Sequence, residues 1–371
     1  MIGTSSRIAR WSVLALAGGA AAPATAQTTD PVFAGWRFSP ATVGSRSAGM
    51  GGAFAAVADD ARAAVTNPAG LTQVPVNEVS LSSGRPWAAV ATGRRRFRLA
   101  AYATKAEQEP AEPRDGPERI ALQPSITEYG VAAGLQMLKR VRIGAAMAHS
   151  RLNVEEEGRN ASNGAQPLHP LVGGEEAQVR FTAGVLIDIF RANGASTSPL
   201  RFAFAVQPGI DWSVPRPGGG TTDVRRPSVT SFGLGWRADN HWSFSAQGDF
   251  IRFQDVVQTL RRNVGDEAAA GFDLPDEVEP RVGGEYATPL TCGCGSVKVR
   301  AGLHYQSPGT LRYQGDDRAL LAAFSGQRRQ TVFTLGGSLF AEHFGNAIRF
   351  DLDARDVLDG PDLSFGVVWR F

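Results

Sequence analysis

Few residues of this 371-residue chain have the types and spacing that catalysis or metal binding would require. The only cysteines, Cys292 and Cys294, form a Cys-Gly-Cys triplet. After export they could form a small disulfide-linked turn, whereas two thiols without a nearby histidine supply too few ligands for zinc. His304 is spaced to share the polar side of one segment with Arg300. We expect it to be partly solvated, and an acid–base pair with a carboxylate stays open.

Catalytic motifs are missing from the sequence. We find no Gly-x-Ser-x-Gly, no His-Glu-x-x-His and no Gly-x-x-x-x-Gly-Lys. Gly49-Met50-Gly51-Gly52 only superficially suggests a nucleotide loop, because no buried strand precedes it and no βαβ unit follows. We therefore predict no enzyme, no cofactor and no bound metal. The formal net charge of +2 gives no reason to expect a nucleic-acid partner.

Many charged side chains of both signs fall on the polar side of alternating segments. Against lipid, each would cost roughly 2–4 kcal/mol near the bilayer midplane. In an enclosed interior they can pair with one another or with water, so we predict a network that stiffens a barrel wall. These residues are Glu128, Arg142, Arg180, Arg201, Asp249, Arg281, Glu285, Arg300, Arg349 and Asp351.

Apolar and polar residues alternate over most of the chain after residue 76, as they do in strands with two unlike faces. For example, Trp242, Phe244 and Phe250 share a face opposite Ser243 and Asp249. No second set of elements could cover the apolar faces, so the pattern predicts an all-β protein, a transmembrane antiparallel β-barrel of about 14 strands. The expected strands are 77–83, 86–91, 95–105, 125–138, 141–156, 176–190, 199–214, 227–238, 242–258, 277–288, 296–307, 329–342, 346–357 and 362–371.

The last strand carries a large apolar residue at every second position: Leu363, Phe365, Val367, Trp369 and Phe371. A terminal aromatic on the apolar face is typical of the strand that closes an outer-membrane barrel. Closure is needed because hydrocarbon cannot hydrogen-bond a free sheet edge. We expect the barrel-assembly machinery to recognise this barrel-closing C-terminal strand.

The start of the chain has the pattern of a secretory signal peptide. Arg7 and Arg10 precede an apolar stretch, residues 11–22, and an Ala-x-Ala end at Ala26. The apolar stretch is too short to span a bilayer as a helix. Residues 1–26 are therefore predicted to be removed, and the mature protein to be exported.

The predicted connections differ in length between the two ends of the barrel. Those at Lys139-Arg140 and Asp239-Asn240 are short, whereas 106–124, 158–175, 259–276 and 308–328 are long. Outer-membrane barrels have short periplasmic turns and long extracellular loops. This asymmetry predicts a multi-pass protein of the bacterial outer membrane with both termini in the periplasm.

Residues 27–76 lack strand alternation and are rich in glycine, alanine and serine. A glycine-rich turn is followed by a run of small residues that could form a short helix. Pro68 restricts Asn67 to extended backbone conformations and supplies no amide donor. Small residues suit a compact plug that packs closely inside a barrel. We expect residues 27–76 to form this plug and residues 77–371 to form the barrel.

The same segment resembles the N-terminal signature of the FadL-type outer-membrane family, which includes long-chain fatty acid transporters, aromatic-hydrocarbon relatives and the PorV-like branch. The resemblance rests on Gly-Met-Gly-Gly-Ala-Phe, Ala-Asp-Asp-Ala and Asn-Pro-Ala-Gly-Leu in this order. It implies a fourteen-stranded barrel with a hatch in the lumen and an apolar or amphipathic ligand that passes through the wall at a kinked strand. The implied hatch residues are Gly49, Gly51, Gly52, Asp59, Asp60, Asn67, Pro68 and Ala69.

The resemblance predicts passive uptake of a hydrophobic small molecule, a long-chain fatty acid or hydrocarbon, with lateral release into the bilayer. Arg142 or Arg300 could hold a carboxylate head group. In the transporters of this family the extracellular loops are long and partly helical, and they form an apolar capture groove. Expected loops here, such as 160–174 and 214–226, are short beside those and rich in Gly, Pro and Asn, and only 268–272 has appreciable apolar content. That departure favours an alternative, a PorV-like scaffold or protein-export subunit. Expected partners are outer-membrane lipid and the ligand, with the protein itself a monomer.

Overall fold

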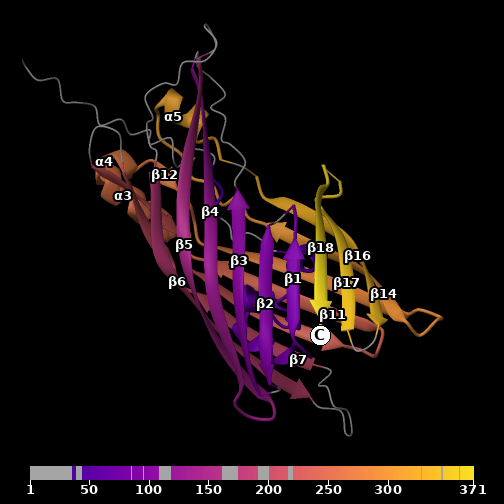
Figure 1. The fold of residues 1–371 in the computed structure, drawn as a ribbon. Helices are drawn as coiled ribbons and strands as arrows, with labels where there is room; N and C mark the ends of the chain where they lie inside the picture. Colours follow the sequence, from indigo (N-terminus) through magenta and orange to yellow (C-terminus); the bar gives the residue numbers. More distant parts are fainter. Residues whose placement is uncertain are drawn as a thin grey trace, which may run out of the picture.

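Antiparallel strands form a closed barrel of fourteen members in the computed structural model of the chain (Figure 1). The first strand, β1 (Glu78–Ser82), pairs with both β2 (Trp87–Arg94) and the last strand, β18 (Asp362–Arg370). The others, in barrel order after β2, are β3 (Phe97–Glu107), β4 (Glu118–Gln136), β5 (Val141–Asn160), β6 (Gly174–Phe190), β7 (Leu200–Gln207), β10 (Val229–Arg237), β11 (Trp242–Ile251), β13 (Glu277–Pro289), β14 (Gly295–Gln306), β16 (Gln330–His343) and β17 (Asn346–Arg355).

The structure describes residues 36–38, 44–84, 86–94, 96–107, 118–160, 174–190, 200–215, 220–326, 328–343, 346–358 and 360–371. The predicted signal peptide, residues 1–26, lies outside the described residues. Within them, no helix is both long enough and apolar enough to cross a membrane.

The two faces of the strands are as predicted. On β17, Leu352 is 58% exposed and Phe350 43% exposed, whereas Asp351 between them is fully buried. The closing strand repeats the pattern, with Phe365 and Trp369 on the outer face and Ser364 buried. Polar groups thus turn into the barrel and large apolar groups turn out of it, as a lipid-facing wall requires.

The short connections gather at one end of the barrel, which we call the short-turn end. It holds the turns at 137–140 and 238–241, the start of β1 and the end of β18. The disulfide between Cys292 and Cys294 forms here as predicted, in the turn that joins β13 to β14. The opposite end, the far end, holds the long connections.

Two predicted strands end seven residues earlier than expected. The segment predicted as 199–214 divides, because β7 stops at Gln207 and β8 (Ile210–Pro215) leaves the barrel to pair with β9 (Thr221–Arg226). The segment predicted as 242–258 becomes helical, since α3 spans Gln254–Val264. Its apolar residues Val256, Val257 and Leu260 have the spacing of one helix face, which overlaps with strand alternation over so few residues.

In the described part of the far end the connections form a folded cap, so the expectation that only 268–272 has appreciable apolar content was wrong. The connection 161–173 lies outside the described residues. The cap consists of the β8–β9 hairpin, α3, α4 (Asp266–Ala269), the small sheet of β12 (Phe272–Asp273) and β15 (Arg312–Tyr313), and α5 (Arg318–Ala323). Its side chains form one buried apolar cluster that includes Trp212, Leu260 and Phe324. Apolar residues spread over several loops therefore gather only in the folded protein.

Candidate functional site

The chain before β1 lies against the inner face of the wall. We call residues 44–76 the N-terminal segment; it contains α1 (Ser45–Gly49), α2 (Ala63–Thr66) and the 3₁₀-helix η2 (Pro68–Gln73). Its close contacts are with inward-facing glycines around the barrel, because a Cβ there would meet the segment. These glycines are Gly134 on β4, Gly144 on β5, Gly184 on β6, Gly283 on β13, Gly302 on β14 and Gly366 on β18.

The glycines at 49, 51 and 52 shape the turn after α1. Gly51 and Gly52 have φ values of 64° and 79°, which favour glycine. The hydroxyl of Thr334 on β16 accepts a bond from the Gly51 amide and donates one to the Gly49 carbonyl, both at 3.0 Å. The run 53–58, which could have formed a short helix, contains only a turn at 55–57.

Asn67 ties two parts of the N-terminal segment to the wall. Its Nδ2 donates to the carbonyls of Ala55 and of Val185 on β6, each at 3.2 Å. Its Oδ1 accepts from the amide of Ala69 at 3.3 Å and so caps η2, in which Pro68 occupies the first turn. Asn67 is fully buried, so each of these bonds satisfies a group that water does not reach.

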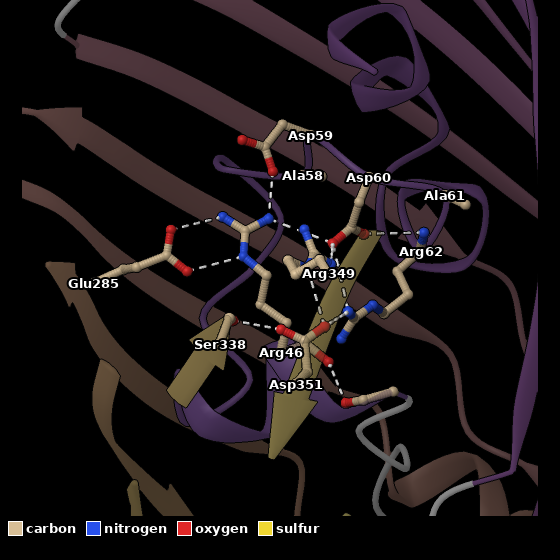
Figure 2. A network of polar contacts seen from close by, with 12 residues as sticks. Arg46, Ala58, Asp59, Asp60, Ala61, Arg62, Glu285, Ser338, Arg349 and Asp351 are labelled. Carbon is tan, nitrogen blue, oxygen red and sulfur yellow. Dashed lines mark hydrogen bonds and ion pairs between the residues drawn. The ribbon is translucent and has the colours of Figure 1, made fainter. Parts of the chain in front are cut away.

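Asp60 is the centre of a buried ionic cluster (Figure 2). Its Oδ2 accepts from Arg349 on β17 at 3.1 Å and from Arg46 at 3.3 Å, and Arg62 lies 3.5 Å away. Burial opposes ionisation, but the guanidinium groups of Arg62, Arg349 and Arg46 outweigh it and hold the pKa of Asp60 well below its usual range. The carboxylate therefore stays charged and joins segment to wall.

Arg46 links the neighbouring carboxylates in the same cluster (Figure 2). It forms a bidentate pair with Glu285 on β13, at 3.0 and 3.1 Å, and also binds Asp59. Its guanidinium carbon lies 5.5 Å from the ring centre of Phe54, a cation–π distance. Both predicted acidic residues, Asp59 and Asp60, are thus fixed by arginines.

A cavity lies between the N-terminal segment and the cap. Within it, the space that the centres of water-sized molecules can occupy is about 110 Å³. Gly52 and Thr66 of the segment line one side, and the aromatic residues Trp36, Phe38 and Trp212 also line it. Trp36 and Phe38 are stacked with ring centres 5.1 Å apart. A cavity with several aromatic side chains in its wall is typical of sites for apolar ligands.

Charged residues of the wall line the same cavity. Glu128 on β4 accepts two bonds of 2.7 Å from Arg180 and one of 2.8 Å from Arg226. Asp249 on β11 pairs with Arg281 at 2.9 Å. The carboxylates are thus neutralised locally, and the apolar surface adjoins a polar band.

The two arginines proposed as head-group contacts lie elsewhere. Arg300 is buried in the ionic cluster and contacts Asp351 and Asp353, while Arg142 pairs with Asp188 near the short-turn end. Neither lines the cavity, so we no longer assign them this role.

The expectation that His304 is partly solvated was also wrong, because it is 2% exposed and bonds to Glu279 at 2.9 Å. Glu279 also accepts from Ser307 at 2.6 Å, so the carboxylate stands between histidine and serine. In a hydrolase triad the histidine lies between the serine and the carboxylate, so this arrangement of His304, Glu279 and Ser307 does not match a triad.

Sequence analysis missed the aromatic residues of the cavity. Trp36 and Phe38 precede the recognised signature, and Trp212 was assigned to a wall strand. Trp212 instead belongs to the β8–β9 hairpin and donates its indole N–H to the Ser150 carbonyl at 3.1 Å. The predicted inward network was correct: the ten charges named from the sequence lie on the inner face, buried or half-buried.

Comparisons with known proteins give the class of fold. The barrel matches a Pseudomonas aeruginosa FadL homologue with a TM-score of 0.58 and 11% identity, over 90% of this chain and 98% of the other. It matches the Pseudomonas putida toluene transporter TodX with a TM-score of 0.56 and 10% identity, over the same shares. The chain thus has the fold of FadL-type barrels. No protein-family model matches it, and no curated protein sequence does.

Proposed function

We propose that this protein is an outer-membrane channel for passive uptake of hydrophobic small molecules. The main support is the aromatic cavity between the cap and the N-terminal segment. Apolar ligands would leave water for this enclosed surface through the hydrophobic effect. The fold shared with a toluene transporter and a FadL homologue supports the same function. The N-terminal segment would act as the hatch, and the short-turn end would face the periplasm.

We further propose lateral release beside β6. This strand pairs with β5 from Gly174 to Ile187 but with β7 only from Ala183 onward. Over residues 174–182, its second edge therefore has no barrel partner among the described strands. Here β8 approaches β6 as part of the cap hairpin. Movement of this hairpin would connect the cavity with lipid without breaking a ladder of wall hydrogen bonds.

The test is uptake of two radiolabelled probes, oleate and toluene, by vesicles with lipopolysaccharide in the outer leaflet. Ser231 lines the cavity, so Ser231→Trp should fill it and reduce uptake to the level of empty vesicles. Phe232→Trp is the matched control, because Phe232 faces outward and the change leaves the cavity intact. Asn67→Ala should raise the rate by loosening the N-terminal segment, since it leaves buried carbonyls unpaired.

If uptake by the wild-type protein does not exceed that of empty vesicles, or if Ser231→Trp behaves like Phe232→Trp, the channel proposal fails. The alternative, a non-transporting scaffold or export subunit, would then be favoured. The use of both oleate and toluene separates a fatty-acid channel from a hydrocarbon channel.

A further inference from the structure

In the part of the chain that the structure describes, three arginines and two carboxylates lie close together at the short-turn end of the lumen. Arg142, Arg201 and Arg237 belong to β5, β7 and β10, and their side chains lie on the inner face. The carboxylates beside them are Asp188 on β6 and Asp59 of the N-terminal segment. This cluster lies across the segment from the aromatic cavity, so the inference does not depend on the proposed function.

Both carboxylates are already engaged by nearer arginines. Arg142 binds Asp188 through two bonds, of 2.9 and 3.0 Å, and Arg46 binds Asp59. Arg201 is left 3.5 Å from Asp188, and Arg237 is left 3.8 Å from Asp59. Among the residues that the structure describes, the buried Nε of Arg201 has no hydrogen-bond partner. Thus, among the described residues, neither of these two guanidinium groups has a close carboxylate partner of its own.

A small hollow lies between these two groups. Arg201, Arg237 and Asp59 line it together with Val57 and Gly235, and it offers about 20 Å³ to the centres of water-sized molecules. Gly235 has no side chain, and a Cβ there would lie within about 3.1 Å of Ala56 and Val57, so the segment packs closely against the wall beside the hollow. Arg237 is 44% exposed, so the hollow is accessible from the short-turn end. This volume suits one compact polar group rather than a whole lipid chain.

We propose that Arg201 and Arg237 bind one oxyanionic group, a carboxylate or phosphate, at the short-turn end of the lumen. A planar guanidinium presents paired N–H donors that match the oxygens of such groups. The bound anion would balance the positive charge of Arg201, whose Nε lies 3.5 Å from Asp188, and of Arg237. Water could fill the hollow but would leave the charge uncompensated.

The binding test uses the full chain in detergent, with [¹³C]formate and inorganic phosphate titrated in turn at constant ionic strength. Saturable broadening of the ¹³C or ³¹P line is expected. Arg201→Gln and Arg237→Gln should each weaken binding about tenfold or more, because each removes a charged donor. Arg237→Lys should restore most of it. Arg252→Gln, which changes an exposed arginine at the far end, should leave binding unchanged.

A second measurement needs no variant. Phenylglyoxal should modify the exposed Arg237 of the wild-type protein, and formate or phosphate should slow this modification but not that of Arg252. The proposal is overturned if the wild type shows no saturable broadening and no protection, or if both glutamine variants bind as the wild type does. Response to only one of the two probes would support the site and identify whether it takes a carboxylate or a phosphate.

Discussion

At the scale of single residues, the N-terminal segment is held by a few fully buried polar groups. The carboxylate of Asp60 forms ion pairs with three arginines, and Asn67 donates hydrogen bonds both to its own segment and to β6. Breaking a buried ion pair on one side leaves an uncompensated charge and costs about 3–5 kcal/mol. We therefore expect these residues to hold the segment against the wall.

The low pKa of Asp60 predicts how the segment responds to pH. An unfolded aspartate titrates near pH 3.9, as a typical value. The pKa of Asp60 is lower in the folded state than in the unfolded state, so its ionised carboxylate stabilises the folded state. This stabilisation is complete above the unfolded pKa and is lost as the pH falls from there through the folded pKa. We expect peroxide oxidation of the buried Met50 to be constant from pH 8 to about pH 5 and to accelerate below about pH 4.

The exposed Met137 is the internal reference for this measurement, because it should react at all pH values. In the Asp60→Asn variant, Met50 should be oxidised faster than in the wild type at pH 7. The further increase of this rate in acid should be smaller than in the wild type. A wild-type rate that stays flat down to pH 3 would contradict the assigned role of Asp60.

At the scale of elements, glycines in the wall let the N-terminal segment approach the strands. A Cβ at Gly302 would lie within contact distance of the backbone at Met50 and Gly51. At Gly337 on β16 it would meet only the Lys298 carbonyl, at an ordinary 3.6 Å. Gly337 faces outward, between the exposed Leu335 and Leu339, so the close approach of the segment concerns inward-facing glycines such as Gly302.

This difference predicts opposite outcomes for two alanine substitutions. Gly302→Ala should destabilise the docked segment by about 1–3 kcal/mol through overpacking. Gly337→Ala should be neutral or slightly stabilising, because alanine suits a strand better than glycine. The rate of Met50 oxidation reports how firmly the segment is docked in each variant. Equal oxidation rates in the two variants would show that the docked segment does not need a glycine at position 302.

At the scale of the whole molecule, closure and outward apolar side chains together specify a membrane barrel. The pairing of β1 with β18 leaves the sheet without a free edge there, and Arg370 bonds to Glu78 across the seam at 2.8 Å. Large apolar groups cover the outer face. In water such a surface would promote association, whereas in a bilayer it is solvated by acyl chains.

A charge on the outer face distinguishes these environments. Leu352→Arg should lower the unfolding free energy in phospholipid bilayers by about 2–4 kcal/mol, because an arginine near the midplane loses its hydration. Leu358 is also exposed but lies in the connection after β17, so Leu358→Arg should change little. Urea titration of both variants in bilayers is the measurement. Equal stabilities would argue against a lipid-facing β17.

The sequence by itself determined most of the wall strands, their two faces and the closing strand, because residue alternation depends only on local geometry and the contrast between lipid and lumen. It also pointed to Asn67, Asp59 and Asp60 through their motif. It could not identify Arg349 and Glu285 as their partners, since cross-lumen contacts join residues more than 200 positions apart. Only the tertiary structure brought Trp36 and Trp212 together in one cavity, because folding of the cap, rather than any local pattern, decides which loop residues meet.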